Sequence, residues 1–483
     1  MFIKKIKISN FRLFAADVGF ELDDLNVPNN SDDGSGINLF VGENGCGKTT
    51  ILDALSMPLL SYKSDSYALD DFNDLERKTL IEIFSQSDFD FDGTMPNKKH
   101  KAKGFSFEAH VRTRGNKAYL SSVVVSDQKY IRADGQTQPK DDSPDLRTSV
   151  NNPFKGNRFN ENDVLFLDRS RTYQIRSGTY SKTRFDRLME DFDFQYINKG
   201  LSDVSGKLQG VLNGVESEFL NKAVDKFKEL TGLELSLAYI SNLRPHEGAF
   251  LSLKKGNNQQ ITIESLGSGY EMVFSLLYSF FLSEQSKKQL IVLIDEPELH
   301  LHPSLQGEFV KILLSLSKTA QIFLSTHSPL FVKQLMLNEK VLIKVIKKSP
   351  KVPEVLQPSE RVLNYLSANE VNYLAFGLAT TEYHSELYNE LESRFWDDPN
   401  NDYKTLKSNG NYDSKDVRQV IFDNEFFGKK RQEPIDSNFK TCLNKVTCHT
   451  YIRNKIHHSS DNGGLPSAEE LRGSIEKMRL FFV

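Results

Sequence analysis

A glycine-rich segment that follows an apolar run carries the residue types that bind phosphate groups. The run at 37–41 predicts a buried strand, and apolar residues at helical spacing come after the segment. Between them the pattern reads Gly42-x-x-x-x-Gly47-Lys48-Thr49. The glycines allow backbone N–H groups to converge on phosphate oxygens, and the N-terminus of a helix adds positive potential. The order of strand, loop and helix therefore predicts a nucleotide-phosphate site.

Two side chains of this segment have separate chemical tasks. Lys48 would place its ammonium against the outer phosphates, where it assists catalysis, and the Thr49 hydroxyl would ligate Mg²⁺. ATP and Mg²⁺ are therefore the expected cofactors. The residues of the segment that we expect to bind nucleotide are Gly42, Asn44, Gly45, Cys46, Gly47, Lys48, Thr49 and Thr50.

Two further apolar runs end in polar residues that could act on a bound nucleotide. The run at 290–294 predicts a central parallel strand and delivers Asp295 and Glu296 at its carboxyl end, where open α/β sheets bind ligands. Asp295 would hold the Mg²⁺ shell, and Glu296 would polarise the attacking water as the catalytic base. A later strand in "QIFLSTHSPLF" ends near His327, which would touch the γ-phosphate as a third catalytic group.

Taken in order, these motifs resemble the ABC-type ATPase heads of the SMC-like and OLD-like class. The stretch "ESLGSGYEMVFSLL" then corresponds to the signature loop at 266–271, and the resemblance implies that Ser268 and Gly269 cap a nucleotide bound by a second copy. It also implies that Arg12, in the opening strand, lies near the nucleotide. Gly267 and Tyr270 depart from the usual Leu-Ser-Ser-Gly-Glu, so we expect weaker or more selective hydrolysis.

The resemblance and the hydrophobic pattern together predict an α/β fold. We expect an ABC-type P-loop ATPase head at 1–345 with a mixed or parallel sheet, and a short helical insertion at 170–245, because no sustained heptads occur at 180–240. After the prolines near 350, amphipathic helical patterns dominate, so 346–483 is predicted to be a mostly α-helical domain.

The segment "NEVNYLAFGLATTEYHSELY" resembles the ATPase subunits of bacterial anti-phage systems, notably Septu and its retron-linked relatives. In those systems a separate HNH nuclease subunit cuts. The resemblance implies an ATPase that senses invasion and controls a partner nuclease, dimerises through nucleotide and assembles further. OLD nucleases carry a metal-dependent TOPRIM domain after the ATPase, and its strand-end acids do not occur in the C-terminal pattern.

The segment "YIRNKIHH" leaves a second function open. Arg453 and Asn454 followed by His458 resemble the Arg-x4-6-His motif of HEPN ribonucleases, which cut RNA without metal. On a regular helix His457 lies about 40° around the axis from Arg453 and His458 about 140° away, so both histidines are candidates. The alternative is a packing or docking helix in which Arg453 pairs with an acid such as Glu469 or Glu470.

Composition limits the remaining classes. The chain has 483 residues and a net charge of −4, so no global field attracts nucleic acid, which remains a candidate partner only through local surfaces. Three cysteines without a paired spacing, no apolar stretch of about 18 residues and no signal sequence predict a cytoplasmic protein without a membrane partner. A third function, an SMC-like DNA repair ATPase, is disfavoured because the long coiled coil is missing. "DFDFDG" begins like a calcium loop, but Lys98 and Lys99 follow, which predicts a solvated hairpin.

Overall fold

The computed structural model divides the chain into two compact units, Met1–Val355 and Leu356–Val483. The division lies beyond the expected boundary at 345, because β15 (Val341–Lys347) and β16 (Glu354–Val355) pair within the first unit. The described residues are 2–25, 34–59, 69–92, 99–111, 123–131, 162–167, 172–173, 182–183, 216–238, 250–255, 259–262, 268–286, 289–336, 338–349, 353–355, 361–400, 415–438, 445–458 and 464–482.

A six-stranded sheet forms the centre of the first unit. Its order is β16-β15-β3-β14-β13-β7, and all neighbours are parallel except the β15–β16 pair. The residues of β3 and β14 are buried along their whole length, which explains why apolar residues predominate in both strands. The further strands of this sheet are β3 (Gly36–Val41), β7 (Asn162–Leu167), β13 (Gln289–Asp295) and β14 (Gln321–Thr326).

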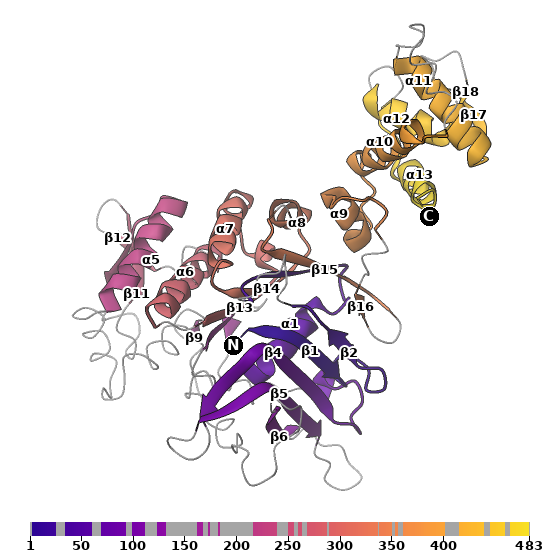
Figure 1. The fold of residues 1–483 in the computed structure, drawn as a ribbon. Helices are drawn as coiled ribbons and strands as arrows, with labels where there is room; N and C mark the ends of the chain where they lie inside the picture. The colour runs from indigo at the N-terminus through magenta and orange to yellow at the C-terminus, as the bar shows by residue number, and fades with distance from the viewer. Residues whose placement is uncertain are drawn as a thin grey trace. The chain divides into compact units, whose positions relative to one another are not determined.

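A second, antiparallel sheet lies on the other side of helix α1 (Lys48–Leu59), which contacts strands of both sheets (Figure 1). In it, Asp92 pairs with Lys99 across the hairpin of β4 and β5, so the expected hairpin is confirmed in place of a calcium loop. The residues of the turn itself lie outside the described part of the chain. The strands, in sheet order, are β2 (Phe20–Leu22), β1 (Ile3–Ser9), β4 (Thr79–Asp92), β5 (Lys99–Val111) and β6 (Val123–Ile131).

The described part of the predicted insertion contains one helix and the beginning of a small sheet. Helix α5 (Glu216–Thr231) packs against α6 (Ser268–Ser286) through Phe227, whose ring meets Phe274 edge-on at 5.8 Å. The other elements are the strands of a three-stranded antiparallel sheet and a two-stranded pair: β10 (Leu235–Ala238), β11 (Phe250–Lys255), β12 (Gln259–Thr262), β8 (Thr172–Tyr173) and β9 (Lys182–Thr183).

Short capped elements follow the central strands. Helix α7 (Pro303–Leu316) begins after His302, whose ring accepts from the Ser304 N–H, and α8 (Pro329–Leu335) begins after Ser328, whose hydroxyl accepts from the Phe331 N–H. Two single turns of 3₁₀ helix complete the unit, η2 (Leu69–Asp71) and η4 (Pro297–Leu299).

The second unit is mostly helical in its described residues, as the sequence predicts. An aromatic core holds it together, in which Phe422, Phe426, Phe427 and Tyr388 are buried. Helix α13 begins at the capping box formed by Ser467 and Glu470. The elements are α9 (Ala368–Phe376), α10 (Thr381–Asp397), α11 (Lys415–Phe422), the π-helix η7 (Asp423–Lys430), β17 (Ile435–Asn438), β18 (Lys445–Thr447), α12 (Cys448–His457) and α13 (Ala468–Leu480).

Two fully buried histidines meet at one hydroxyl in this core. The Ser474 Oγ lies 2.9 Å from His384 Nε2 and 2.7 Å from His449 Nδ1. Burial is the main cause that lowers the pKa of each histidine to about 3, with a smaller contribution from the charge of His449 at His384 and of Lys477 at His449. Both rings are therefore neutral at physiological pH.

This burial predicts that the second unit loses stability as the pH falls. Below the ordinary histidine pKa of about 6.5, each of these histidines takes up a proton in the unfolded chain but stays neutral in the folded core. Each one then lowers the free energy of unfolding by about 1.4 kcal/mol per pH unit. Hydrogen exchange of α10 and α12, corrected for intrinsic rates, should show lower opening free energies at pH 5.5 than at pH 7.5. Helix α1 contains no histidine and begins at the phosphate loop, so it is the internal control. Equal pH dependence in α1 and in α10 would contradict the assignment.

Candidate nucleotide site

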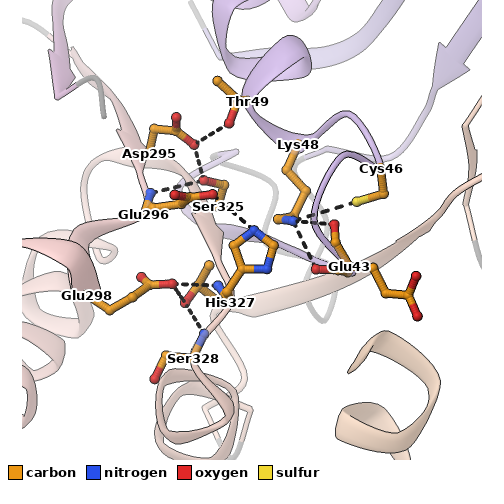
Figure 2. A network of polar contacts seen from close by, with 12 residues as sticks. Glu43, Cys46, Lys48, Thr49, Asp295, Glu296, Glu298, Ser325, His327 and Ser328 are labelled. Carbon is orange, nitrogen blue, oxygen red and sulfur yellow. Dashed lines mark hydrogen bonds and ion pairs between the residues drawn. The ribbon is translucent and has the colours of Figure 1, made fainter. Parts of the chain in front are cut away.

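Three strand ends come together at one edge of the central sheet. Because β3, β14 and β13 are parallel neighbours, the segments that follow them lie side by side, and the register pairs Val41 with Thr326 and Asp295 with Ser325. Figure 2 shows Lys48, Asp295 and His327, from these three segments, gathered in one polar network. The structure brings these three residues together, and their catalytic roles stay predictions.

Backbone geometry favours glycine in the phosphate loop. Gly42, Gly45 and Gly47 have φ of 155°, 76° and 103°, in the region that favours glycine. A Cβ atom at Gly42 would also lie 2.2 Å from the Ile346 carbonyl oxygen, at the end of β15. A side chain at Gly42 is therefore excluded by contact with β15, and one at Gly45 or Gly47 would be strained by the backbone conformation.

The Lys48 ammonium is turned into the loop. It donates to the carbonyl oxygens of Gly42 at 2.9 Å and Glu43 at 3.0 Å and contacts the Cys46 sulfur at 3.6 Å. Burial lowers the pKa of Lys48 and raises that of Cys46. An anion in the loop would supply a stronger partner for this ammonium than the carbonyl groups do.

The expected magnesium ligands already touch each other. The Thr49 hydroxyl donates to Asp295 Oδ1 at 3.1 Å, and the Ser325 hydroxyl donates to the same oxygen. Burial raises the pKa of the Asp295 carboxyl, so a cation beside it would favour the ionised form. A hydroxyl and a carboxylate at this spacing, next to a phosphate loop, fit Mg²⁺, which usually takes one or two protein ligands and completes its shell with phosphates and water.

Glu296 and His327 form the next pair. His327 Nε2 lies 3.0 Å from Glu296 Oε1, and the Glu296 side chain is 7% exposed. Glu296 has φ 45° and ψ 61°, a left-handed conformation that is uncommon for a residue with a side chain. Its N–H donates to the Ser325 carbonyl at 3.2 Å and contacts the Ser325 hydroxyl at 3.1 Å, which holds the turn.

Two residues of this network were not given roles from the sequence. Ser325 ties Asp295 to Glu296, and Glu298 accepts hydrogen bonds from the end of β14. Ser325 could have been found from its position, because a hydroxyl next to a strand end faces the neighbouring strand end in parallel register. The contacts of Glu298 depend on the turn at Glu296, for which the sequence has no signal.

Arg12 is engaged by two acids. Its guanidinium lies 2.5 Å from Asp53 of α1 and 2.7 Å from Asp71 of η2. The two carboxylates therefore tie the opening strand region to the helix of the phosphate loop. A direct contact of Arg12 with nucleotide stays a prediction.

The predicted signature is described only from Ser268, where α6 begins, and residues 266 and 267 lie outside the described part. A Cβ atom at Gly269 would lie 2.4 Å from the His300 carbonyl oxygen. The start of α6 therefore approaches the segment after η4 at backbone distance within one chain. A trans contact of Ser268 and Gly269 with nucleotide stays a prediction.

The "YIRNKIHH" segment forms the last seven residues of α12 and its C-cap. Asn454 is buried and accepts from Gln419 Nε2 at 2.9 Å and from Arg453 at 3.2 Å. His457 and the C-cap residue His458 are both exposed, and partial desolvation and the charge of Arg453 lower the pKa of His457. Glu470, one of the acids considered for Arg453 in the packing alternative, pairs with Lys455 at 3.4 Å.

A family model described as "AAA domain, putative AbiEii toxin, Type IV TA system" matches residues 37–333, which include the phosphate loop and the ends of β13 and β14. The chain belongs to this family. The match covers more than half of the chain, so the prediction that the chain contains an AAA-type ATPase head is confirmed.

The chain is also similar to curated relatives at low sequence identity. "Endonuclease GajA" of Bacillus cereus (strain HuB5-5) is 22% identical over 68% of this chain and 58% of the relative. "Retron Vc95 probable ATPase" of Vibrio cholerae serotype O1 biovar El Tor is 23% identical over 60% of this chain and 66% of the relative. "Septu protein PtuA" of Bacillus thuringiensis is 25% identical over 29% of this chain and 41% of the relative. The chain thus spans less than two thirds of the length of each of these three relatives.

The described residues contain no helix long and apolar enough to cross a membrane. The described part also holds no group of three or more histidine, cysteine or acidic side chains arranged to bind a metal ion.

Replacing Glu296 by glutamine should separate binding from turnover. Glu296→Gln should still bind ATP, because the phosphate loop is intact, but should hydrolyse it about 10²- to 10⁴-fold more slowly, the range expected for loss of a general base. Lys48→Ala should instead weaken binding by at least about tenfold, through the lost charge-assisted hydrogen bond. Titration calorimetry and phosphate release measure the two effects.

Glu308→Gln is the matched control, since Glu308 lies on α7 and pairs with Lys311. It should behave like the parent. Hydrolysis by Glu296→Gln at the parent rate would show that another group activates the water.

Proposed function

We propose that this chain is a Mg²⁺-dependent ATPase whose nucleotide state controls a partner nuclease in anti-phage defence. The observation that carries the ATPase part is the pair of contacts at the strand ends, Thr49 with Asp295 and Glu296 with His327. One pair suits metal-bound phosphate, and the other suits an attacking water and its proton. Membership of the AAA family supports nucleotide binding.

Hydrolysis would use the chain's own groups in a simple order. Lys48 leaves its loop carbonyls for the outer phosphates, and bound Mg²⁺ would supply charge neutralisation beside Thr49 and Asp295. Glu296 accepts a proton as a water oxygen bonds to the γ-phosphorus, and the bond to the bridging oxygen of ADP breaks. His327 holds the Glu296 carboxylate through Nε2, and as the doubly protonated imidazolium it would also donate from Nδ1 toward the γ-phosphate. ADP and inorganic phosphate are the products.

The same proposal includes head-to-head dimerisation through nucleotide. Helix α6 has 19 residues and begins at Ser268. The positive potential at its N-terminus would stabilise phosphate bound by another copy. Each site would then need the phosphate loop of one copy and the α6 start of the other. We also propose that this dimer assembles further with the partner nuclease.

Mixing two inactive variants tests the shared site. Lys48→Ala and Ser268→Arg should each abolish turnover alone, while an equal mixture should recover about a quarter of the parent sites, because half of the random dimers are mixed and each keeps one intact site. Gly269→Arg is unsuitable, because a side chain at Gly269 would collide with His300 in its own chain. Parent-like turnover by Ser268→Arg alone, or no recovery in the mixture, would contradict the dimer.

The regulatory part of the proposal is supported by the separate helical unit and the similarity to the retron and Septu proteins. By the resemblance noted in the sequence, the partner would be an HNH-type nuclease. Purification of the tagged chain from its native operon, with Mg²⁺ and ATP, should recover a stoichiometric nuclease subunit. Recovery of the chain alone, with full protection against phage in cells that lack neighbouring genes, would contradict this part.

A second candidate function is RNA cleavage by the helical unit. The observation that favours it is the neighbouring pair Arg453 and His457, because the arginine contributes to the lowered pKa of the imidazole, which then stays neutral and able to accept a proton. Asn454 is tied into the core and would orient Arg453 rather than contact RNA.

RNA sequencing after infection separates the two candidates. If the unit cuts RNA, new RNA ends should appear without a partner nuclease and should be lost in Arg453→Ala and in at least one of His457→Ala and His458→Ala. Lys455→Ala, on the same helix, is the control and should keep them. Protection and RNA ends unchanged by all of these variants would leave α12 a packing or docking helix.

A further inference from the structure

Glu298 joins the end of β13 to the end of β14 within the proposed nucleotide site. It lies in η4, two residues after Glu296, and its Oε1 accepts from the Thr326 hydroxyl at 2.9 Å and from the His327 N–H at 2.5 Å. Figure 2 shows Glu298 and Glu296 reaching His327 from different sides, one at its backbone and one at its imidazole. Two acids from one turn thus contact the same residue.

The hydrogen bonds continue into the next residue. The Thr326 hydroxyl that donates to Glu298 also accepts from the Ser328 N–H at 2.9 Å. Ser328 then caps α8 through its own hydroxyl. The backbone of 326–328 is therefore fixed by one carboxylate oxygen at its start and one helix cap at its end. This segment carries the imidazole, so its direction decides whether Nε2 meets Glu296 at 3.0 Å.

Glu298 is costly to remove because its Oε1 is the acceptor for two donors at the end of β14. Thr326 is fully buried, and without Glu298 its hydroxyl and the His327 N–H would lose their acceptor, which costs more than an ordinary hydrogen bond contributes. Burial also raises the pKa of Glu298. The second carboxylate oxygen, Oε2, is buried and has no hydrogen-bond partner among the described residues.

We propose that Glu298 is a positioning residue for ATP hydrolysis, which acts by holding the His327 backbone so that the imidazole faces Glu296. The inference rests on the proposed ATPase function. Since the Oε1 acceptor does the holding, a neutral amide oxygen can replace it. Glu298 is thereby distinguished from Glu296, whose charge and proton affinity are needed.

A double-mutant cycle with kinetic readout tests the role. Glu298→Ala should lower kcat about 10- to 100-fold, because buried donors that lose their acceptor no longer hold His327 in place in the transition state. KM should change less than about threefold. Glu298→Gln should stay within about threefold of the parent, because its amide oxygen keeps the acceptor. In a His327→Ala background, Glu298→Ala should add less than about a twofold loss, because its effect passes through the absent imidazole.

Two kinetic outcomes would overturn the proposal. Glu298→Gln as slow as Glu296→Gln would make Glu298 a catalytic base, and losses that multiply in the double variant would show that Glu298 acts independently of His327. Hydrogen exchange of residues 322–332 gives a readout that needs no turnover: Glu298→Ala should speed exchange there and Glu298→Gln should not. If the parent does not hydrolyse ATP, the ATPase proposal is wrong. If hydrogen exchange is unchanged in Glu298→Ala, the positioning role of Glu298 is wrong.

Discussion

The parallel pairing of β13, β14 and β3 determines where the polar groups of the nucleotide site lie. Each strand is buried over most of its length and is mainly apolar, and the polar groups of the site lie at or just beyond the carboxyl ends of the strands. Parallel strands leave the sheet at the same edge. A one-residue slip of β13 against β14 would separate Asp295 from Ser325 and turn the carboxylate away from Thr49. The register is thus a chemical requirement as well as a packing one.

A local departure from regular backbone geometry adds to this arrangement. The left-handed conformation at Glu296 costs on the order of 1–3 kcal/mol, and it persists because neighbouring groups over-determine it. Hydrogen bonds to Ser325 hold the turn from one side, and η4 with Glu298 holds it from the other. The strain directs the Glu296 carboxylate back toward His327 instead of along the strand. Such a turn fixes the direction of the carboxylate more accurately than a flexible loop would.

Local pattern predicted the parts of the site that depend on neighbours in sequence. The strand before Gly42, the strand before Asp295 and the helix after Lys48 were all predicted from the sequence, because hydrophobic periodicity is a local property. Features that depend on contacts across the chain were not readable. The approach of Gly269 to His300 and the burial of Asn454 against Gln419 each join segments far apart in the sequence. The same is true of the Arg12 pairing with Asp53 and Asp71.

A density map of the Glu296→Gln chain with ATP and Mg²⁺ would show whether these strand ends form a composite Mg²⁺–ATP site. We expect β- and γ-phosphates on the backbone amides of the phosphate loop, Lys48 turned to them, and Mg²⁺ about 2.1 Å from the Thr49 hydroxyl. The α6 start of a second copy should lie over the γ-phosphate. Nucleotide bound at another place, or enclosed by a single chain with Ser268 of the second copy remote from it, would show that the composite site is wrong.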